Sequence, residues 1–305
     1  MHPIKFLCPK RSIAVAIFLS LAIIRTSVKA QLNPLATQYF QNQYLFNPAM
    51  AGLNDGLNIN LSVRKQWSSI PGSPATEAVS ADYLLNRAAF GVNVYADQSG
   101  LLKSTRAVAT YAYHIPLGQD NQKLNFGLSA GVLSQRVPLD QISGDPGDLS
   151  VARYNDRKSF LDGDFGTSYT SNSLTIQAAL PNLRSVFNQD HDNFAVDRSL
   201  FFTAVSYKFN FGEAINAITL EPKVGFRGVK GYTNILDVGA NLMLAENQLS
   251  IQGIYHSTKS TTFGFGLNKD SYSILAFYTT ETAAISNYTN GDFEIGLRLH
   301  LPNKK

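Results

Sequence analysis

The chain has 305 residues, of which 26 are Lys or Arg and 22 are Asp or Glu, giving a formal net charge of +4. Residues 1–30 hold five of the basic side chains and none of the acidic ones, so the rest of the chain carries 21 minus 22 charges, or −1. Composition therefore gives no argument for a nucleic acid partner. Cys8 is the only cysteine, so residues 31–305 can form neither a disulfide nor a cysteine-based metal site.

The start of the chain has the pattern of an export signal. Lys5, Lys10 and Arg11 precede an apolar run at residues 12–24, and Val28–Ala30 has the small residues of a cleavage site. We predict a signal peptide over residues 1–30 that is cleaved after Ala30. The apolar run is shorter than the about 20 residues that a membrane-spanning helix needs, and an uncleaved anchor is the alternative.

Residues 31–56 show no alternation of apolar and polar side chains. Asn47-Pro48 and Ala51-Gly52 within this segment are typical of turns. We predict a folded N-terminal arm, on the periplasmic side or as a plug in the mouth of the fold that follows.

Alternating apolar and polar residues begin at Leu57 and continue to the end of the chain, which predicts β-strands. In the last predicted strand, Phe293, Ile295 and Leu297 face one way, while Glu294 and Arg298 face the other. Turn signals divide the chain into about fourteen strands. We expect them at residues 57–67, 76–84, 89–97, 104–115, 122–133, 164–170, 173–180, 199–210, 217–228, 233–243, 248–257, 260–267, 271–280 and 291–302.

The strand pattern favours a membrane barrel. No stretch after residue 30 has 18 consecutive apolar residues, so membrane-spanning helices are excluded. An exported membrane protein without them must be a closed barrel, because only closure pairs every backbone group in lipid. We predict an all-β fold, a transmembrane antiparallel β-barrel of about 14 strands over residues 57–305. The long connections 134–163, 181–198 and 281–290 would share its outer end, and a soluble β-sandwich is the alternative.

Closure of such a barrel would place the first strand beside the last. Arg64 would then lie near Glu294 and Arg298 on the lumenal face. We predict an Arg64–Glu294 ion pair at this seam, with two separately solvated charges as the alternative. Trp67, at the end of the first strand, is typical of the aromatic belt at a membrane interface.

Two motifs, Asn47–Gly52 and Arg64–Trp67, resemble the PorP/SprF family of outer-membrane barrels of the type IX secretion and gliding machinery of Bacteroidetes. Further segments that resemble the family lie along nearly the whole chain, at Gly72–Thr76, Tyr111–Tyr113, Asn125–Val132, Asp162–Gly166 and Asp292–Leu297. Two segments depart from the family pattern, Gly253–His256 and Phe277–Thr280, and suggest a divergent paralogue.

The resemblance implies a place in the outer membrane and a function in export or surface attachment of secreted adhesins by protein–protein contact. Implied partners are outer-membrane lipid, the periplasmic ring and translocon of the secretion system, and the C-terminal domains of secreted adhesins. Candidate contact residues, by the motifs, are Asn47, Pro48, Gly52, Arg64, Gln66 and Trp67. A passive porin or a hydrophobic-solute transporter is the alternative, because the strand number does not decide whether the lumen is open.

The sequence gives little support for catalysis or metal binding. His256-Ser257 is the only adjacent pair of a base and a nucleophile, and neighbouring strand residues point to opposite faces. Asp140, Asp145, Asp148, Asp156 and the Asp190–Asp192 segment could bind Ca²⁺, but their spacing matches no known loop, and a solvated acidic loop is the simpler interpretation. We therefore expect no catalytic, cofactor or metal site.

Overall fold

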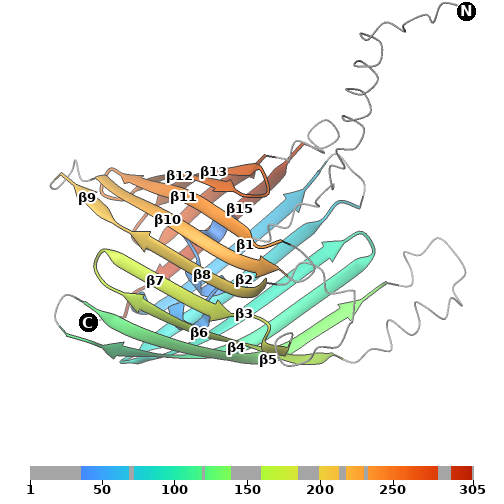
Figure 1. The fold of residues 1–305 in the computed structure, drawn as a ribbon, viewed down its shortest axis with the longest axis horizontal. Coiled ribbons are helices and arrows are strands. Elements are labelled where there is room, and N and C mark those ends of the chain that lie inside the picture. Colours follow the sequence, from blue (N-terminus) through green and yellow to red (C-terminus); the bar gives the residue numbers. More distant parts are fainter. Residues whose placement is uncertain are drawn as a thin grey trace, which may run out of the picture. The chain divides into compact units, whose positions relative to one another are not determined.

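The computed structural model describes residues 36–68, 72–118, 121–138, 159–184, 199–212, 218–229, 233–280 and 290–303 of the chain. Its strands pair antiparallel into one closed sheet (Figure 1). The strands are β1 (Leu57–Gln66), β2 (Ala75–Leu85), β3 (Ala88–Ser99), β4 (Leu102–Pro116), β5 (Lys123–Arg136), β6 (Phe160–Thr170), β7 (Leu174–Leu180), β8 (Ser199–Tyr207), β9 (Phe209–Phe211), β10 (Ile218–Val229), β11 (Ile235–Leu244), β12 (Leu249–His256), β13 (Ser260–Asn268), β14 (Tyr272–Thr279) and β15 (Asp292–Leu301). The predicted all-β antiparallel barrel is confirmed. Within the described ranges, no helix is long and apolar enough to cross a membrane.

The barrel closes where the first strand meets the last. β1 pairs with β15 along its whole length, from Leu57 opposite Leu301 to Gln66 opposite Asp292. β10 pairs with β11, which joins the two ends of the remaining sheet. The predicted neighbourhood of the first and last strands is therefore confirmed.

One predicted strand, 199–210, is divided into β8 and β9. β8 pairs with β10 as far as Ser206 opposite Lys223, and β9 resumes the same register with Phe209 opposite Leu220. The gap lies opposite Pro222, whose nitrogen has no hydrogen to donate to the ladder. β8 and β9 are thus one interrupted strand, and the ring contains the predicted fourteen.

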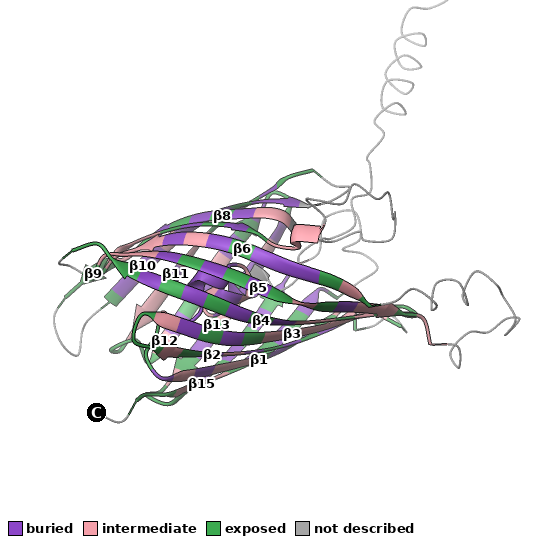
Figure 2. Cartoon of the chain, turned by 90° about the horizontal axis from the view of Figure 1, so that it is seen from below, coloured by how far each residue is buried: buried purple, intermediate pink, exposed green. Residues whose placement is uncertain are grey.

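The barrel is apolar on its outside and polar on its inside. Figure 2 shows buried and exposed residues alternating along the strands. At the seam, Ile295 is 66% exposed and Val63 56%, whereas Glu294 and Arg64 are each 2% exposed. A water-soluble sandwich would bury its apolar faces, so this arrangement excludes that alternative and fits a lipid-facing surface.

The two ends of the barrel differ in their connections. The turn end, where β1 begins and β15 finishes, has the short connections 86–87, 171–173, 245–248 and 269–271. The opposite end, here called the loop end, has the long connections 137–159, 181–198 and 280–291. The predicted grouping of the long connections at one end is confirmed.

Candidate functional site: a lumen filled by the N-terminal segment

Residues 36–56, here called the plug, occupy the lumen of the barrel (Figure 1). They form three 3₁₀ turns, η1 (Ala36–Tyr39), η2 (Gln43–Leu45) and η3 (Pro48–Met50). Gln38 binds Glu294 of β15 near the loop end, and Gly52 binds Asp82 of β2 near the turn end. The plug therefore runs along the lumen from the loop end to the turn end before β1 begins.

Aromatic side chains of the plug pack against small and aromatic residues of the wall. The Tyr39 ring lies 4.7 Å from that of Phe46 and 5.5 Å from that of Phe202, measured between centroids. A second group packs Tyr44 and Ala51 against alanines of β3 and β4. Burial of such rings contributes a large part of the free energy that holds a segment in place.

The Asn47 motif begins the third turn of the plug and fixes it to the wall. The Asn47 side chain accepts a hydrogen bond of 3.0 Å from the Ala49 N–H, and Pro48 occupies the first position of the turn. The Asn47 amide also donates to the carbonyl of Thr167 on β6 at 3.1 Å. Asn47 is 0% exposed, so its contacts are with the barrel itself.

Glycines in the wall make room for this turn. A Cβ atom on Gly127 of β5 would lie 2.2 Å from the Pro48 carbonyl carbon, and one on Gly166 of β6 would lie 2.0 Å from Asn47 Oδ1. Neither backbone can move away freely, since both strands are paired on each side. The wall and the motif are therefore complementary in shape.

Gly52 ends the plug in a conformation that favours glycine. Its φ angle is +70°, and a Cβ atom there would lie 2.3 Å from the Ala89 Cβ. The Gly52 N–H donates to Asp82 Oδ2 at 2.8 Å. Asn47, Pro48 and Gly52 are thus all buried against the wall, and none is open to a partner while the plug is seated.

Arg64 lies on the lumenal face directly opposite Glu294, but its ion pair is with Asp292. The predicted Arg64–Glu294 pair is therefore wrong. The Glu294 carboxylate instead binds the plug, with one oxygen accepting from the Thr37 hydroxyl and the other from the Gln38 amide. Arg64 binds the neighbouring inward-facing carboxylate instead.

Gln66 and Trp67 complete the seam at the loop end. The Gln66 amide donates to Asp292 Oδ2 at 3.3 Å. Trp67 has a φ angle of 49°, and its N–H donates to the Gly291 carbonyl at 3.0 Å. Its indole Nε1 is buried and has no partner within the described part of the chain. The place of Trp67 in an aromatic belt stays a prediction.

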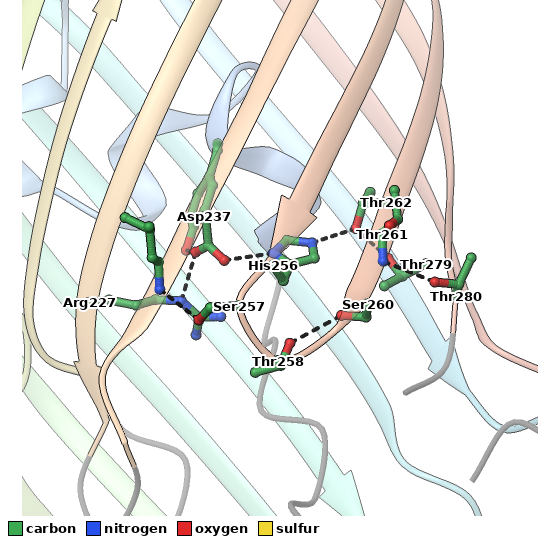
Figure 3. Close-up of polar contacts among 12 residues, drawn as sticks. Arg227, Asp237, His256, Ser257, Thr258, Ser260, Thr261, Thr262, Thr279 and Thr280 are labelled. Atoms are coloured by element: carbon green, nitrogen blue, oxygen red, sulfur yellow. Dashed lines mark hydrogen bonds and ion pairs between the residues drawn. The ribbon is translucent and has the colours of Figure 1, made fainter. Parts of the chain in front are cut away.

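A second polar network joins β10, β11, β12 and β13 (Figure 3) and reaches the plug through Tyr39. Asp237 accepts from the Tyr39 hydroxyl at 2.7 Å, from Arg227 Nε at 3.1 Å and from His256 Nδ1 at 2.6 Å. His256 Nε2 then lies 2.9 Å from the Thr262 hydroxyl. Burial raises the pKa of the Tyr39 phenol, which keeps that hydroxyl a donor to Asp237.

This network has the order of a hydrolase triad without access for a substrate. His256 and Thr262 are both 0% exposed, so neither can reach a substrate in this structure. Ser257 lies on the exposed face, where its hydroxyl accepts from the Leu236 N–H at 3.0 Å. The geometry therefore supports a structural function for His256, which orients Asp237 toward the plug.

Sequence reasoning missed a third charged group, at the loop end of the wall. Arg106 of β4 contacts Asp162 at 3.0 Å and Asp164 at 2.6 Å, both on β6. The same carboxylates accept from the backbone N–H groups of Asn182 and Arg184, at 2.9 and 3.4 Å. Alternation does place Arg106 and the two aspartates on polar faces, but their pairing depends on strand register.

Arg298 lies at the turn end rather than among the seam ion pairs. It stands opposite Asn60 of β1 and forms no ion pair with any described residue. Its side chain lines two cavities beneath the plug, of about 270 and 240 Å³, and the larger one is lined mainly by polar groups.

Among the residues that the structure describes, no group of three or more His, Cys, Asp or Glu could hold a metal ion. The loop carboxylates considered for Ca²⁺, Asp140, Asp145, Asp148, Asp156 and the segment Asp190–Asp192, lie outside the described residues. The candidate site is therefore the plugged lumen and its two mouths.

The chain is similar to several solved bacterial outer-membrane proteins. Acinetobacter baumannii outer membrane protein Omp33 is 8% identical with a TM-score of 0.46, over 80% of this chain and 98% of that one. The P. putida toluene transporter TodX is 11% identical with a TM-score of 0.48, over 86% and 95%. The CymD monoaromatic hydrocarbon channel is 12% identical with a TM-score of 0.49, over 86% and 93%. No curated protein matches the chain.

The family described as type IX secretion system membrane protein PorP/SprF matches residues 28–299. This span includes the plug, nearly every residue of the barrel wall and both N-terminal motifs. The chain belongs to the PorP/SprF family.

Proposed function

We propose that this protein is the type IX secretion component that assists export or surface attachment of secreted adhesins by protein–protein contact. Membership of the PorP/SprF family supports a type IX component, and the lipid-facing barrel supports a place in the outer membrane. The proposed partners are the periplasmic ring, the translocon and the C-terminal domains of adhesins. The protein would carry out no catalysis of its own.

The observation that carries the proposal is the seated plug. It is bound along its length, from Gln38 on Glu294, through Asn47 on Thr167, to Gly52 on Asp82. Aromatic packing fills the space between these polar anchors. A lumen occupied in this way suits a rigid mount for partners better than a passive water-filled pore.

The loop end provides the proposed mount. Arg106 fixes Asp162 and Asp164, and these carboxylates hold the first residues after β7 against the wall. Contact loops on a rigid scaffold are the usual arrangement for recognition. Gln66 and Trp67 lie at this end of the barrel and stay candidates for partner contact, whereas Asn47, Pro48 and Gly52 would act by seating the plug.

Processing of the N-terminus is part of the proposal. Cleavage after Ala30 would leave Gln31 as the first residue of the mature protein. Intact mass measurement of protein purified from outer membranes tests this directly. A protein that retains residues 1–30 would show that the segment is an anchor.

The function is tested by deleting the gene and comparing surface and culture-fluid proteins with those of the complemented strain by quantitative proteomics. Loss of one or a few large adhesins, with other export intact, would support a dedicated export partner. Loss of all type IX cargo would support a core component. An unchanged set of exported proteins would contradict the secretion function and favour transport.

A further inference from the structure

A polar cavity of about 270 Å³ lies at the turn end, between the plug and the wall. Its roof is the plug segment Phe40–Tyr44, and its sides come from the turn-end portions of β1, β2, β5, β6, β7 and β15. Amide side chains line much of it, at Gln41, Asn42, Gln43, Asn54, Asn58, Asn60 and Asn121.

The charged side chains in this cavity are mostly basic. Lys123, Lys208 and Arg298 line it, against the single carboxylate of Asp82. Asp82 is already occupied, because it accepts from the Gly52 N–H at 2.8 Å and from the Asn58 amide at 3.2 Å. The three basic side chains form no ion pair with any residue in the described ranges.

Arg298 also borders the second cavity, of about 240 Å³, together with Lys269 and His300. Lys269 Nζ lies 3.4 Å from Gln248 Oε1, and His300 Nε2 lies 3.7 Å from the exposed carboxylate of Asp55. Arg298 therefore borders both cavities, and it attracts Asp82 across the first one without forming an ion pair with it. A half-buried guanidinium in this setting favours a carboxylate ligand, which it can bind through two parallel hydrogen bonds.

We propose that the turn-end cavity binds a carboxylate-bearing ligand that enters from the turn end, with Arg298 as its main contact. Lys123 and Lys208 add positive charge, and the amide side chains offer donors and acceptors to the rest of the ligand. An acidic peptide segment and a free dicarboxylate share this chemistry. The site does not depend on the proposed secretion function, because it follows from the lining residues alone.

Binding is tested with the purified full-length barrel in detergent. The probe is a fluorescently labelled tetrapeptide of alternating aspartate and glutamate, followed by anisotropy. Its uncharged asparagine–glutamine analogue is the ligand control, and unlabelled succinate and inorganic phosphate are competitors. We expect saturable binding of the acidic peptide and no binding of the analogue. If succinate competes with an affinity equal to that of the peptide, the site is assigned to free dicarboxylates. If succinate competes more weakly than the peptide binds, the site is assigned to acidic peptides.

Arg298→Gln and Lys208→Gln remove one charge each from the cavity, and Lys103→Gln removes one from the exposed loop-end part of β4. We expect at least about tenfold weaker binding for Arg298→Gln, a few-fold loss for Lys208→Gln and no change for Lys103→Gln. Lys208 lies between β8 and β9, so its variant tests the site even where Arg298→Gln fails to fold. Equal losses in all three variants, or equal binding of both peptides, would overturn the proposal.

Discussion

Gly166 of β6 lies so close to Asn47 of the plug that a Cβ atom on residue 166 would stand 2.0 Å from the Asn47 side-chain oxygen. The same turn of the plug lies equally close to Gly127 of β5, where a Cβ atom would stand 2.2 Å from the Pro48 carbonyl carbon. The two strands are hydrogen bonded to each other, with Gly127 directly opposite Gly166. The wall thus carries a flat patch of paired glycines that receives the Asn47 motif.

Gly166→Ala should loosen the plug, because the added methyl group must displace either Asn47 or the strand. Overpacking of this kind costs about 1–3 kcal/mol. The measurement is urea unfolding of the purified barrel in lipid vesicles, together with protease sensitivity of the plug. Gly225→Ala is the matched control, since its inward-facing Cβ would find its nearest neighbour, Phe202, at an ordinary 3.7 Å. Equal effects of the two variants would show that the close contact with Asn47 does not make Gly166 more sensitive to an added methyl group than Gly225.

Deletion of residues 31–52 should convert a closed barrel into a conducting one. The segment contributes the aromatic packing and the polar anchors that fill the lumen. Planar-bilayer recordings of the purified protein should show little conductance for the wild type and stable open channels for the deletion. Large conductance of the wild type would instead favour the porin alternative. A barrel that fails to assemble without the plug is recognised by its loss of heat-modifiable migration on gels.

Most of the fold could be predicted from the sequence because a barrel strand has a strict two-residue period. Because Glu294 stands between the apolar residues Phe293 and Ile295, the pattern alone assigns it to the lumenal face, and the observed register agrees. The interruption between β8 and β9 was missed, since the cause, Pro222, lies on the neighbouring strand rather than within the segment.

The side-chain contacts in the plugged lumen could be predicted less well. They join parts of the chain whose neighbourhood the alternation of apolar and polar residues does not indicate. The pattern placed Arg64 opposite Glu294, but Arg64 pairs with Asp292, and Glu294 binds the plug donors Thr37 and Gln38. The Asp237–His256 contact needs the register of β11 on β12, in which these two residues are direct neighbours. No periodicity in residues 36–56 indicates which wall residues they meet.

Arg64→Gln should destabilise the barrel by about 3–5 kcal/mol, since it leaves the buried Asp292 carboxylate without its cation. Lys65→Gln is the matched control, because it removes the same charge from the next residue, which faces outward and is exposed. Urea unfolding in vesicles should show little change for that variant.

A double-mutant cycle identifies the partner of Arg64. Arg64→Gln combined with Asp292→Asn should give a coupling free energy above about 1 kcal/mol, and larger than that of Arg64→Gln combined with Glu294→Gln. A larger coupling free energy with Glu294→Gln than with Asp292→Asn would support the pairing expected from the strand pattern and contradict the structure. Unfolding free energies for the four members of each cycle are sufficient to decide which carboxylate is the partner of Arg64.

His256→Gln should lower the stability of the barrel without altering any hydrolytic activity. The substitution removes the imidazole that bonds both Asp237 and Thr262, and loss of a hydrogen bond to a charged group costs about 1.5–3 kcal/mol. Ser257→Ala, on the exposed face of the same strand end, removes only the neutral hydrogen bond from the Leu236 N–H and should lower the unfolding free energy by about 1 kcal/mol or less. Purified wild-type protein and both variants should release no fatty acid from phospholipid vesicles. Hydrolysis by the wild type that disappears in His256→Gln would show that the buried Asp237–His256–Thr262 series opens to substrate and works as a catalytic triad.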